Sequence, residues 1–191
     1  MSPRSLTLTT LGARELVLTR TFAAPRPLVF DAFTVPELLV RWYGARGWRL
    51  VECDVDLRVG GAWRYVSRGP DDEEMTQYGT YREVDPPRRL VYTERFVDQS
   101  FAGESLVTTR LEDRDGRTTT LRTTVRLPSA EARDLVLSRP MERGLGEGFE
   151  RLDAVLATET AGRGDPGRRP GELEDGEDAP DAGSGTRGSR T

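Results

Sequence analysis

The 191-residue sequence contains no histidine and only one cysteine. A single cysteine cannot form an internal disulfide, and a Cys/His metal cluster cannot be assembled from one cysteine and no histidine. The same absence removes Ser-His and Cys-His nucleophile pairs and the commonest general base of enzymes. Much familiar enzyme chemistry is thereby excluded, and we expect neither a metal site nor a cofactor.

Long apolar segments are also missing. No run approaches the ~20 apolar residues that a bilayer-spanning helix needs, and the mean hydropathy is −0.57. Residues 1–18 contain no continuous apolar core and no small-residue cleavage site, so we expect no secretory signal. These features predict a cytoplasmic protein with no membrane span.

Lysine, isoleucine and asparagine are absent, and all 28 basic residues are arginines. We interpret this bias as codon usage in a GC-rich bacterial genome. The net charge is −4 and the isoelectric point about 5.1. Because a nucleic-acid-binding protein normally carries a basic surplus that displaces counterions from phosphates, we expect no nucleic-acid partner.

The composition changes near residue 160. Residues 161–191 include eight glycines, three prolines and no aromatic residue, with Leu173 as the only large aliphatic side chain. Such a segment cannot bury enough apolar surface to offset the entropy of ordering it. We therefore expect one folded domain over residues 14–158 and a disordered Gly/Pro/acidic tail over residues 159–191, solubilising rather than partner-binding.

Most of the expected domain has the alternating polarity of half-buried strands. The expected strands are 15–22, 51–57, 62–66, 75–84, 89–97, 105–112 and 118–127. Two short helices, over 25–34 and 36–42, are predicted between the first and second strands.

A helical region begins at Ser129 and is divided by Pro140. After the proline, one apolar stripe predicts a long amphipathic helix with Met141, Leu145, Phe149, Leu152 and Leu156. A largely antiparallel seven-stranded sheet with this helix against its concave face is the simplest way to bury these elements. The predicted fold class is α+β.

Seven short motifs follow one another through this region. They are Arg20-Thr-Phe-Ala-Ala-Pro25, Val29-Phe-Asp-Ala-Phe-Thr-Val-Pro-Glu37, Arg41-Trp-Tyr-Gly44, Asp56-Leu-Arg-Val-Gly-Gly-Ala-Trp63, Gly79-Thr-Tyr-Arg-Glu-Val-Asp-Pro-Pro87, Arg89-Leu-Val-Tyr-Thr93 and Arg151-Leu-Asp153. In this order they resemble the START-like (SRPBCC) superfamily, in the branch named after the activator of the heat-shock-protein-90 ATPase (AHSA-like).

The resemblance covers about residues 14–158 and implies a helix-grip fold. In that fold a curved antiparallel sheet wraps around a long C-terminal helix, with an apolar cavity between them. The sequence departs from the family pattern at Pro140, where glycine is expected, and at Ala45, where proline commonly follows Trp-x-Gly. The first departure could bend the approach to the long helix, and the second could reshape the cavity mouth.

Aromatic side chains supply the candidate ligand-binding residues. Trp63 and Tyr65 share one strand face, and Tyr92, Glu94 and Phe96 share another. These faces could form an aromatic pocket wall with a few polar tips, or they could fill a core without a cavity; the resemblance favours the pocket. The candidates are Trp42, Trp63, Tyr65, Tyr78, Tyr81, Tyr92, Glu94, Phe96, Met141, Leu145 and Phe149.

Glu94 is the one candidate for proton-transfer chemistry, because a carboxyl in an aromatic cavity would have a raised pKa. The alternative, a surface glutamate paired with one of many arginines, is favoured. Cys53 has no neighbouring group that would lower its pKa, so we interpret it as a small buried hydrophobic residue.

Two further patterns have more than one interpretation. Glycines at 144, 146 and 148 lie inside the last helix, where each costs about 1 kcal/mol relative to alanine. Gly144 and Gly148 could let the helix backbone approach either the sheet or a ligand closely. Arg110, Arg122 and Arg126 alternate with threonines, which we interpret as a solvated strand face rather than a phosphate site.

Three functions follow from these patterns. The first is a module that binds a hydrophobic or aromatic small molecule between sheet and helix. The second, implied by the superfamily, is an enzyme similar to polyketide cyclases or dehydratases, with Glu94 and a nearby tyrosine in acid–base roles. The third, implied by the family name, is a co-chaperone-type module with a protein partner, and a homodimer is a further possibility. The third is the least favoured, because the eukaryotic activators carry an additional N-terminal domain.

Overall fold

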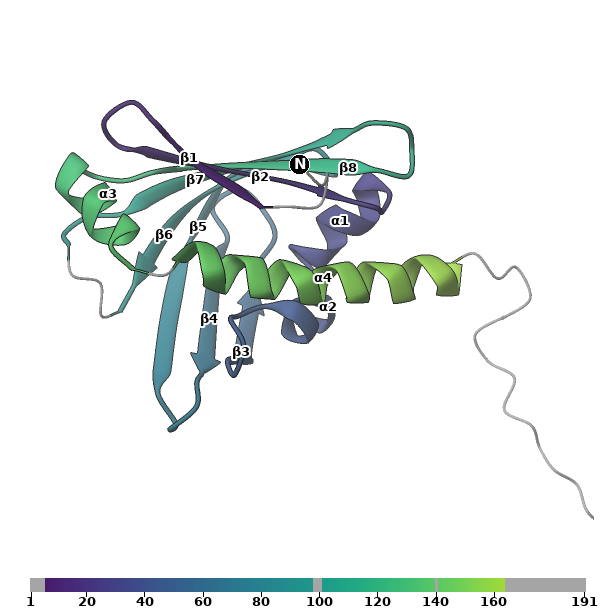
Figure 1. Cartoon of the computed structure of the whole chain (residues 1–191), viewed down its shortest axis with the longest axis horizontal. Helices are drawn as coiled ribbons and strands as arrows, with labels where there is room; N and C mark the ends of the chain where they lie inside the picture. Colours follow the sequence, from purple (N-terminus) through teal and green to yellow (C-terminus); the bar gives the residue numbers. More distant parts are fainter. Residues whose placement is uncertain (1–5, 98–100, 140, 164–191) are drawn as a thin grey trace, which may run out of the picture.

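A single curved antiparallel sheet dominates the computed structural model, which describes residues 6–97, 101–139 and 141–163 (Figure 1). Its eight strands are β1 (Thr7–Leu11), β2 (Glu15–Phe22), β3 (Arg49–Val55), β4 (Ala62–Arg68), β5 (Glu74–Asp85), β6 (Arg89–Phe96), β7 (Ser105–Asp113) and β8 (Thr119–Arg126). The helices are α1 (Arg26–Ala32), α2 (Pro36–Trp42), α3 (Ala130–Leu137) and α4 (Met141–Arg163). The fold class is therefore α+β, as predicted, with a helix-grip architecture.

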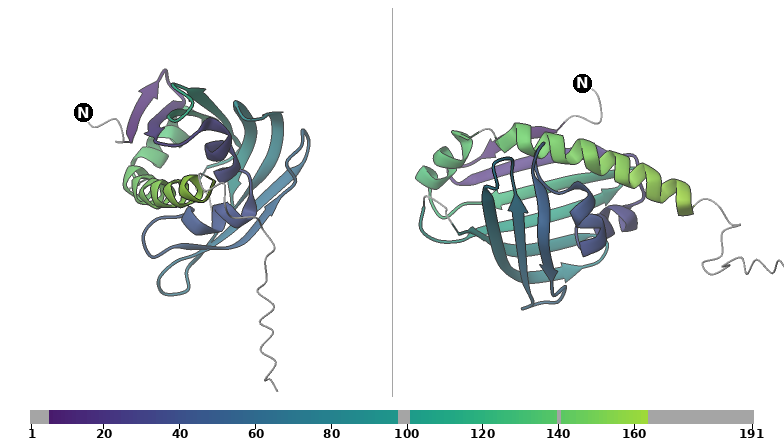
Figure 2. Two further views of the ribbon diagram at one scale, coloured as in Figure 1. Left: turned by 90° about the vertical axis from the view of Figure 1, so that its right-hand side faces the viewer. Right: turned by 90° about the horizontal axis from the view of Figure 1, so that it is seen from below.

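The strand order explains how the concave face is enclosed. The sheet runs β1-β2-β8-β7-β6-β5-β4-β3, so that the chain must cross from β2 to the opposite edge at β3. This crossover contains α1 and α2, and both helices contact α4. Figure 2 shows the sheet curving around α4, with α1 and α2 on the same concave side. The connection that closes the sheet topology thus also closes one end of the space around α4.

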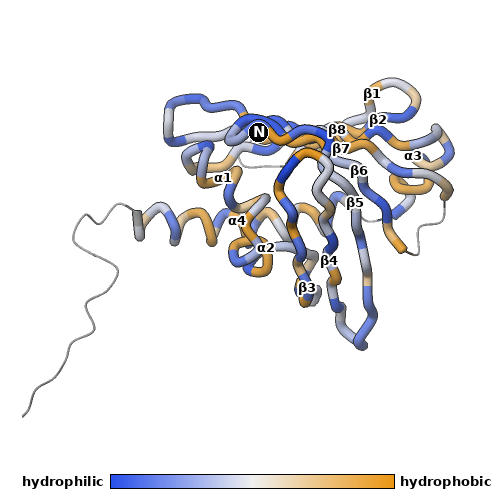
Figure 3. Tube along the Cα trace, turned by 180° about the vertical axis from the view of Figure 1, so that it is seen from behind, coloured by the Kyte–Doolittle hydropathy of each residue, from blue (hydrophilic) through white to orange (hydrophobic). Residues whose placement is uncertain are grey.

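Alternation along the strands gives the sheet its two faces. In β4, Trp63 and Tyr65 are buried on the concave side, whereas Arg64 between them is exposed. Hydrophobic and hydrophilic residues alternate visibly along β3 and β4 (Figure 3). This is the period-two pattern expected of strands with one face toward the core.

The main hydrophobic core lies where α1, α2 and the middle of α4 meet the sheet. Its most buried members include Phe22, Leu28, Leu39, Leu152 and Leu156, each at most 2% exposed. The Trp42 indole nitrogen donates a hydrogen bond of 2.8 Å to the Ala32 carbonyl oxygen and so joins α2 to α1. A smaller cluster of Leu16, Leu127 and Ala132 lies beneath α3.

All seven predicted strands are present, and β1 is an eighth that the sequence analysis did not predict. The strand β1 is short and threonine-rich, and it pairs only with β2 at the sheet edge. Ser129 is the N-cap of α3, because its hydroxyl accepts a hydrogen bond from the Ala132 amide at 3.1 Å. Helix α4 extends to Arg163. Residues 164–191 of the expected tail, and Pro140, lie outside the described residues.

None of the helices in the described ranges combines the length and apolar character that crossing a bilayer requires.

Candidate functional site

A cavity of about 720 Å³ lies between the concave face of the sheet and the first half of α4. From α4 it is lined by Gly144, Leu145, Gly148 and Phe149, and from α3 by Leu135 and Val136. Strands β4 to β8 supply the floor. The concave face is therefore not completely filled by core side chains, and the volume falls in the range of ligand pockets.

Nine of the eleven candidate residues line this cavity. They are Trp42, Trp63, Tyr65, Tyr81, Tyr92, Glu94, Phe96, Leu145 and Phe149. The structure does not describe the side chain of Met141.

Tyr78 does not line the cavity, and its placement there is corrected. Its side chain is 38% exposed, on the convex face of β5. Along this strand Gln77 and Tyr81 are buried on the concave side. Residues three apart on a strand point to opposite faces, so Tyr78 and Tyr81 could not both face the cavity.

Several lining residues were missed by the sequence analysis. Met75 and Gln77 share the face of Tyr81, and extending the alternation backward along β5 would have found them. Ser105 and Thr109 line the cavity from β7 by the same rule. By contrast, Tyr43 lies in the segment after α2, where no periodic pattern indicates the direction of a side chain.

The aromatic wall consists of rings in mutual contact. The Trp63 and Tyr65 ring centroids are 4.8 Å apart, and the Tyr43 ring lies 5.3 Å from that of Tyr65. Gly79 makes room for this wall, since a Cβ atom there would lie 2.8 Å from the Trp63 indole nitrogen and 1.7 Å from the Thr93 carbonyl oxygen. The glycine thus lets the Trp63 ring cross β5 closely.

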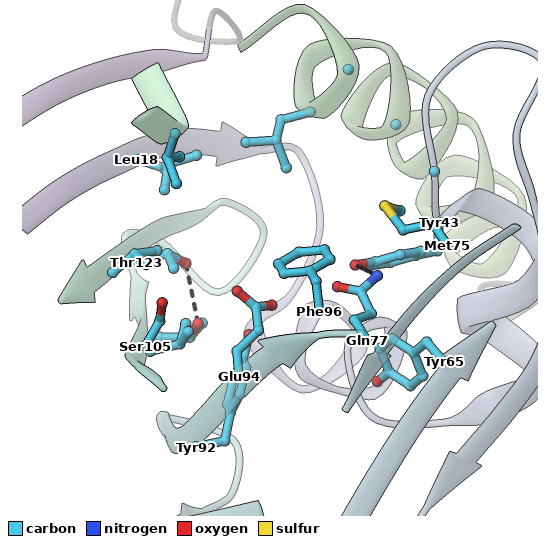
Figure 4. A pocket seen from close by; sticks show the side chains of 18 of the residues that line it. Leu18, Tyr43, Tyr65, Met75, Gln77, Tyr92, Glu94, Phe96, Ser105 and Thr123 are labelled. Carbon is cyan, nitrogen blue, oxygen red and sulfur yellow. Dashed lines mark hydrogen bonds between the residues drawn. The ribbon is translucent and has the colours of Figure 1, made fainter. Parts of the chain in front are cut away.

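Polar groups converge on the floor of the cavity (Figure 4). The buried Gln77 amide donates a hydrogen bond to the Tyr43 hydroxyl. The hydroxyls of Thr109 and Thr123 are 3.1 Å apart. Glu94 projects from β6 between the Gln77–Tyr43 pair and the Thr109–Thr123 pair, and its carboxyl group points into the cavity.

Glu94 has no hydrogen-bond or ion-pair partner within the part of the chain that the structure describes. Burial raises the pKa of its carboxyl to about 7. The favoured interpretation of a surface glutamate paired with an arginine is therefore wrong, because the alternation of β6 turns Glu94 to the same side as Tyr92 and Phe96.

The tyrosines of the wall remain protonated at neutral pH. Burial, followed by the charge of Glu94, raises the pKa of Tyr43 and of Tyr92 well above the ordinary value. Burial also raises the pKa of Tyr81 to about 12. The Tyr43 and Tyr92 hydroxyls can therefore act as hydrogen-bond donors near Glu94.

The segment between α2 and β3 forms one side of the cavity and is held by α4. The Arg151 guanidinium donates hydrogen bonds to the carbonyl oxygens of Trp42, at 3.1 Å, of Ala45, at 3.3 Å, and of Gly44. In addition, the Arg46 amide donates to the Glu147 carboxylate at 2.8 Å. The Arg151-Leu-Asp153 motif thus fixes the position of lining residues 43–45.

Two of the three helix glycines, Gly144 and Gly148, pack closely against this same segment. A Cβ atom at Gly148 would lie 3.1 Å from the Gly44 carbonyl oxygen, and one at Gly144 would lie 3.4 Å from the Ala45 side chain. Gly146 has nothing within 4 Å of such an atom. The close approach is therefore to the segment after α2 and not to the sheet.

Other candidate groups lie outside the cavity. Cys53 is half-buried, and burial followed by the charge of Asp54 raises the pKa of its thiol to about 11, which disfavours the reactive thiolate. Arg110, Arg122 and Arg126 are exposed, as expected of a solvated strand face. In the described ranges, no three cysteine, aspartate or glutamate side chains are grouped so that they could hold a metal ion.

The chain is similar to proteins of known structure. A family model described as Activator of Hsp90 ATPase homolog 1-like protein matches residues 23–157. A Rhodobacter sphaeroides protein has a TM-score of 0.76 and 33% identity, over 81% of this chain and 99% of that one. A Mycobacterium smegmatis protein has a TM-score of 0.70 and 27% identity, over 79% and 96% of the two chains. The AHSA1 protein of Silicibacter pomeroyi has a TM-score of 0.63 and 25% identity, over 76% and 99%. No curated protein matches the chain.

Proposed function

The chain belongs to the Activator of Hsp90 ATPase homolog 1-like family, and we propose that it binds a hydrophobic or aromatic small molecule in the cavity between the sheet and α4. The observation that carries this proposal is the cavity itself, about 720 Å³ in volume. Ligand pockets typically combine apolar and aromatic walls with a few polar groups that fix orientation. The wall around Trp63 and the floor around Glu94 have these two characters.

Local rigidity supports binding rather than collapse of the cavity. The strands of the floor are hydrogen-bonded in register, and Arg151 holds the opposite side through three carbonyl oxygens. A preformed cavity spares the ligand much of the ordering cost of binding.

The proposal is tested by mass spectrometry under native conditions, followed by calorimetric titration with a panel of apolar and aromatic compounds. We expect one defined compound to be retained or a subset of the panel to bind. Val125→Trp fills the cavity from β8 and should abolish binding, since Val125 is a lining residue. The matched control is Val51→Trp, at an exposed position of β3 outside the lining, which should bind as the parent does. Equal binding by both variants would contradict the proposal.

A second candidate function is catalysis of the polyketide cyclase or dehydratase kind, and Glu94 is the observation that favours it. A carboxyl with a pKa of about 7 in an apolar cavity can exchange a proton near neutral pH, and Tyr92 lies beside it as a donor. Under this alternative, Glu94→Gln abolishes turnover of a bound polyketide but preserves its binding. Loss of binding and turnover together would count against a catalytic role.

The proposal also covers the cellular location of the protein and its possible protein partners. The three similar proteins named above come from bacteria, and we place this chain in a bacterial cytoplasm, where a single free cysteine is compatible with a reducing environment. A co-chaperone-type protein partner rests on the family description alone.

A further inference from the structure

Charge is distributed very unevenly over the cavity. Its charged lining residues are Glu74, Glu94 and Arg139, of which Glu74 and Arg139 are exposed. Helix α4 contributes no ionisable side chain to the lining. Glu94 is therefore the only charged group of the described lining residues that lies in the interior.

The surroundings of Glu94 complement a positive charge. Tyr92 and Phe96 flank it on the same strand face, and Trp63 lies 5.5 Å from Tyr92 between ring centroids. The negative faces of aromatic rings attract cations, and the attraction is stronger where water is excluded. Ser105, which pairs with Glu94 in the β6–β7 register, and Gln77 add oxygen atoms that can accept hydrogen bonds from a donor-rich group.

A buried carboxyl without a cationic partner is costly when ionised. A ligand that brings a positive charge would supply the partner that no described arginine supplies. An anionic ligand would meet Glu94 with no interior cation to offset the repulsion, and a neutral ligand would leave the carboxyl without a counter-charge.

We propose that the cavity selects a molecule with an aromatic or apolar body and a basic, protonated nitrogen, and that this nitrogen binds the Glu94 carboxylate. The inference rests on the proposed binding function and names the class of its ligand. The apolar body lies against the Trp63–Tyr65 wall and α4, and the charged end reaches the floor of the cavity.

The test uses three probes that share one body and differ only in the head group. They are 2-(naphthalen-2-yl)ethylamine, 2-(naphthalen-2-yl)ethanol and naphthalene-2-acetate, titrated calorimetrically into the full chain at pH 7.5. We expect the amine to bind at least about tenfold more tightly than the alcohol, as a charge-assisted hydrogen bond would give. The acetate should bind most weakly.

Two variants assign the preference to Glu94. Glu94→Gln keeps the shape of the side chain and should reduce the amine-to-alcohol affinity ratio to about one while the alcohol still binds. Glu74→Gln removes the exposed carboxylate at the cavity mouth and should keep the preference. Thermal unfolding of both variants checks that each is folded.

Proton release provides a second readout. A bound ammonium should drive Glu94 to its ionised form, and at pH 7 this releases about half a proton per ligand, because the pKa of the free carboxyl is about 7. The neighbouring Tyr43 and Tyr92, and also Tyr81, stay protonated at this pH, so they do not contribute. The release should be measurable in buffers of different ionisation enthalpy and absent in Glu94→Gln.

The outcomes separate the two proposals. If the alcohol binds and the amine gains nothing over it, the cation preference is wrong and the binding function stands. Retention of the preference in Glu94→Gln also overturns the assignment. If no probe and no member of the wider panel binds, the binding function itself is wrong.

Discussion

At the scale of single residues, Glu94 makes stability depend on pH. Its pKa is about 7 in the folded chain, above the ordinary value of 4.5, because burial disfavours the ionised form. The folded state therefore keeps its proton over a range in which the unfolded chain loses it. The contribution of Glu94 to stability is therefore highest below about pH 4.5 and is lost as the pH rises through about 7.

The matching prediction compares the parent with Glu94→Gln in urea unfolding between pH 4.5 and 8. Relative to this variant, the parent should lose about 2–3 kcal/mol of unfolding free energy over the range. The reason is that burial raises the pKa of Glu94 to about 7, and each pKa unit corresponds to about 1.36 kcal/mol. Above pH 8 the difference should be constant, because Tyr43 and Tyr92 have pKa values well above that range. Parallel stability curves for the two proteins would show that Glu94 is solvated.

Two glycines of different surroundings should respond oppositely to alanine. Gly79→Ala places a methyl group 1.7 Å from the Thr93 carbonyl oxygen, so β5 and β6 must separate, and we expect a loss of at least about 2 kcal/mol. Gly146→Ala meets nothing within 4 Å inside a helix, and should gain about 0.5–1 kcal/mol. Chemical unfolding measures both values, and a similar effect of the two substitutions would contradict the packing described around Trp63.

At the scale of elements, Arg151 determines how firmly the segment after α2 is held. Arg151→Met removes the hydrogen bonds to the Trp42, Gly44 and Ala45 carbonyl oxygens and should cost about 2 kcal/mol. Hydrogen exchange of residues 43–48 should become faster, and a ligand should leave the cavity sooner. The change is expected to be largest at this segment, because it is the only one that these bonds hold.

The control for this prediction lies on the same helix. The Arg143 side chain is 80% exposed and pairs with Glu147 one turn later. Arg143→Met should therefore cost about 0.5 kcal/mol or less and leave exchange of residues 43–48 nearly unchanged. Equal effects of the two arginine substitutions would mean that Arg151 has no specific anchoring role.

The strands also show which features could be predicted from the sequence and which could not. Alternation predicted seven strands and placed Tyr92 and Glu94 on the same strand face, because successive side chains of a strand point to opposite sides. It did not say whether that face looks inward, and the surface interpretation of Glu94 was therefore favoured although the structure turns this residue into the cavity. Alternation was applied incompletely at Tyr78, where counting from Tyr81 gives the exposed face. The strand β1 was missed because a short, threonine-rich edge strand buries little and leaves a weak pattern.

The cavity itself could not be derived from the pattern of residues. A filled core and a pocket share the same alternation, and only the volume left between sheet and helix distinguishes them. The position of Tyr43 in the cavity lining depends on a non-periodic segment. Arg151, more than 100 positions later in the sequence, holds this segment through the carbonyl oxygens on either side of Tyr43. Such contacts follow from the tertiary fold and leave no local signal.

At the scale of the whole molecule, the space around α4 has a packed end and a hollow end. Residues Leu152 and Leu156 are at most 2% exposed and lie in the core with α1 and α2. The buried Arg20 guanidinium adds a salt bridge to Asp153 at this end, and it lies over the Phe22 ring. One to two turns before Leu152, Gly144, Leu145 and Gly148 face the cavity. The same helix thus has firm packing in its middle and a largely unfilled side near its start.

This asymmetry predicts where a ligand stabilises the protein. Without ligand, amide hydrogen exchange should be slowest near residues 149–156 and faster at residues 142–148 and in α3, because few apolar contacts hold the hollow end. A ligand in the cavity should slow exchange at residues 142–148, in α3 and at the start of β7, and should change the packed end little at concentrations near its dissociation constant. In the cavity-filling Val125→Trp variant, the tryptophan should slow exchange in the same segments without ligand, and added ligand should have no effect. Uniform protection over both ends would instead show that α4 opens only as one unit, and the cavity would not be a separately deformable part of the fold.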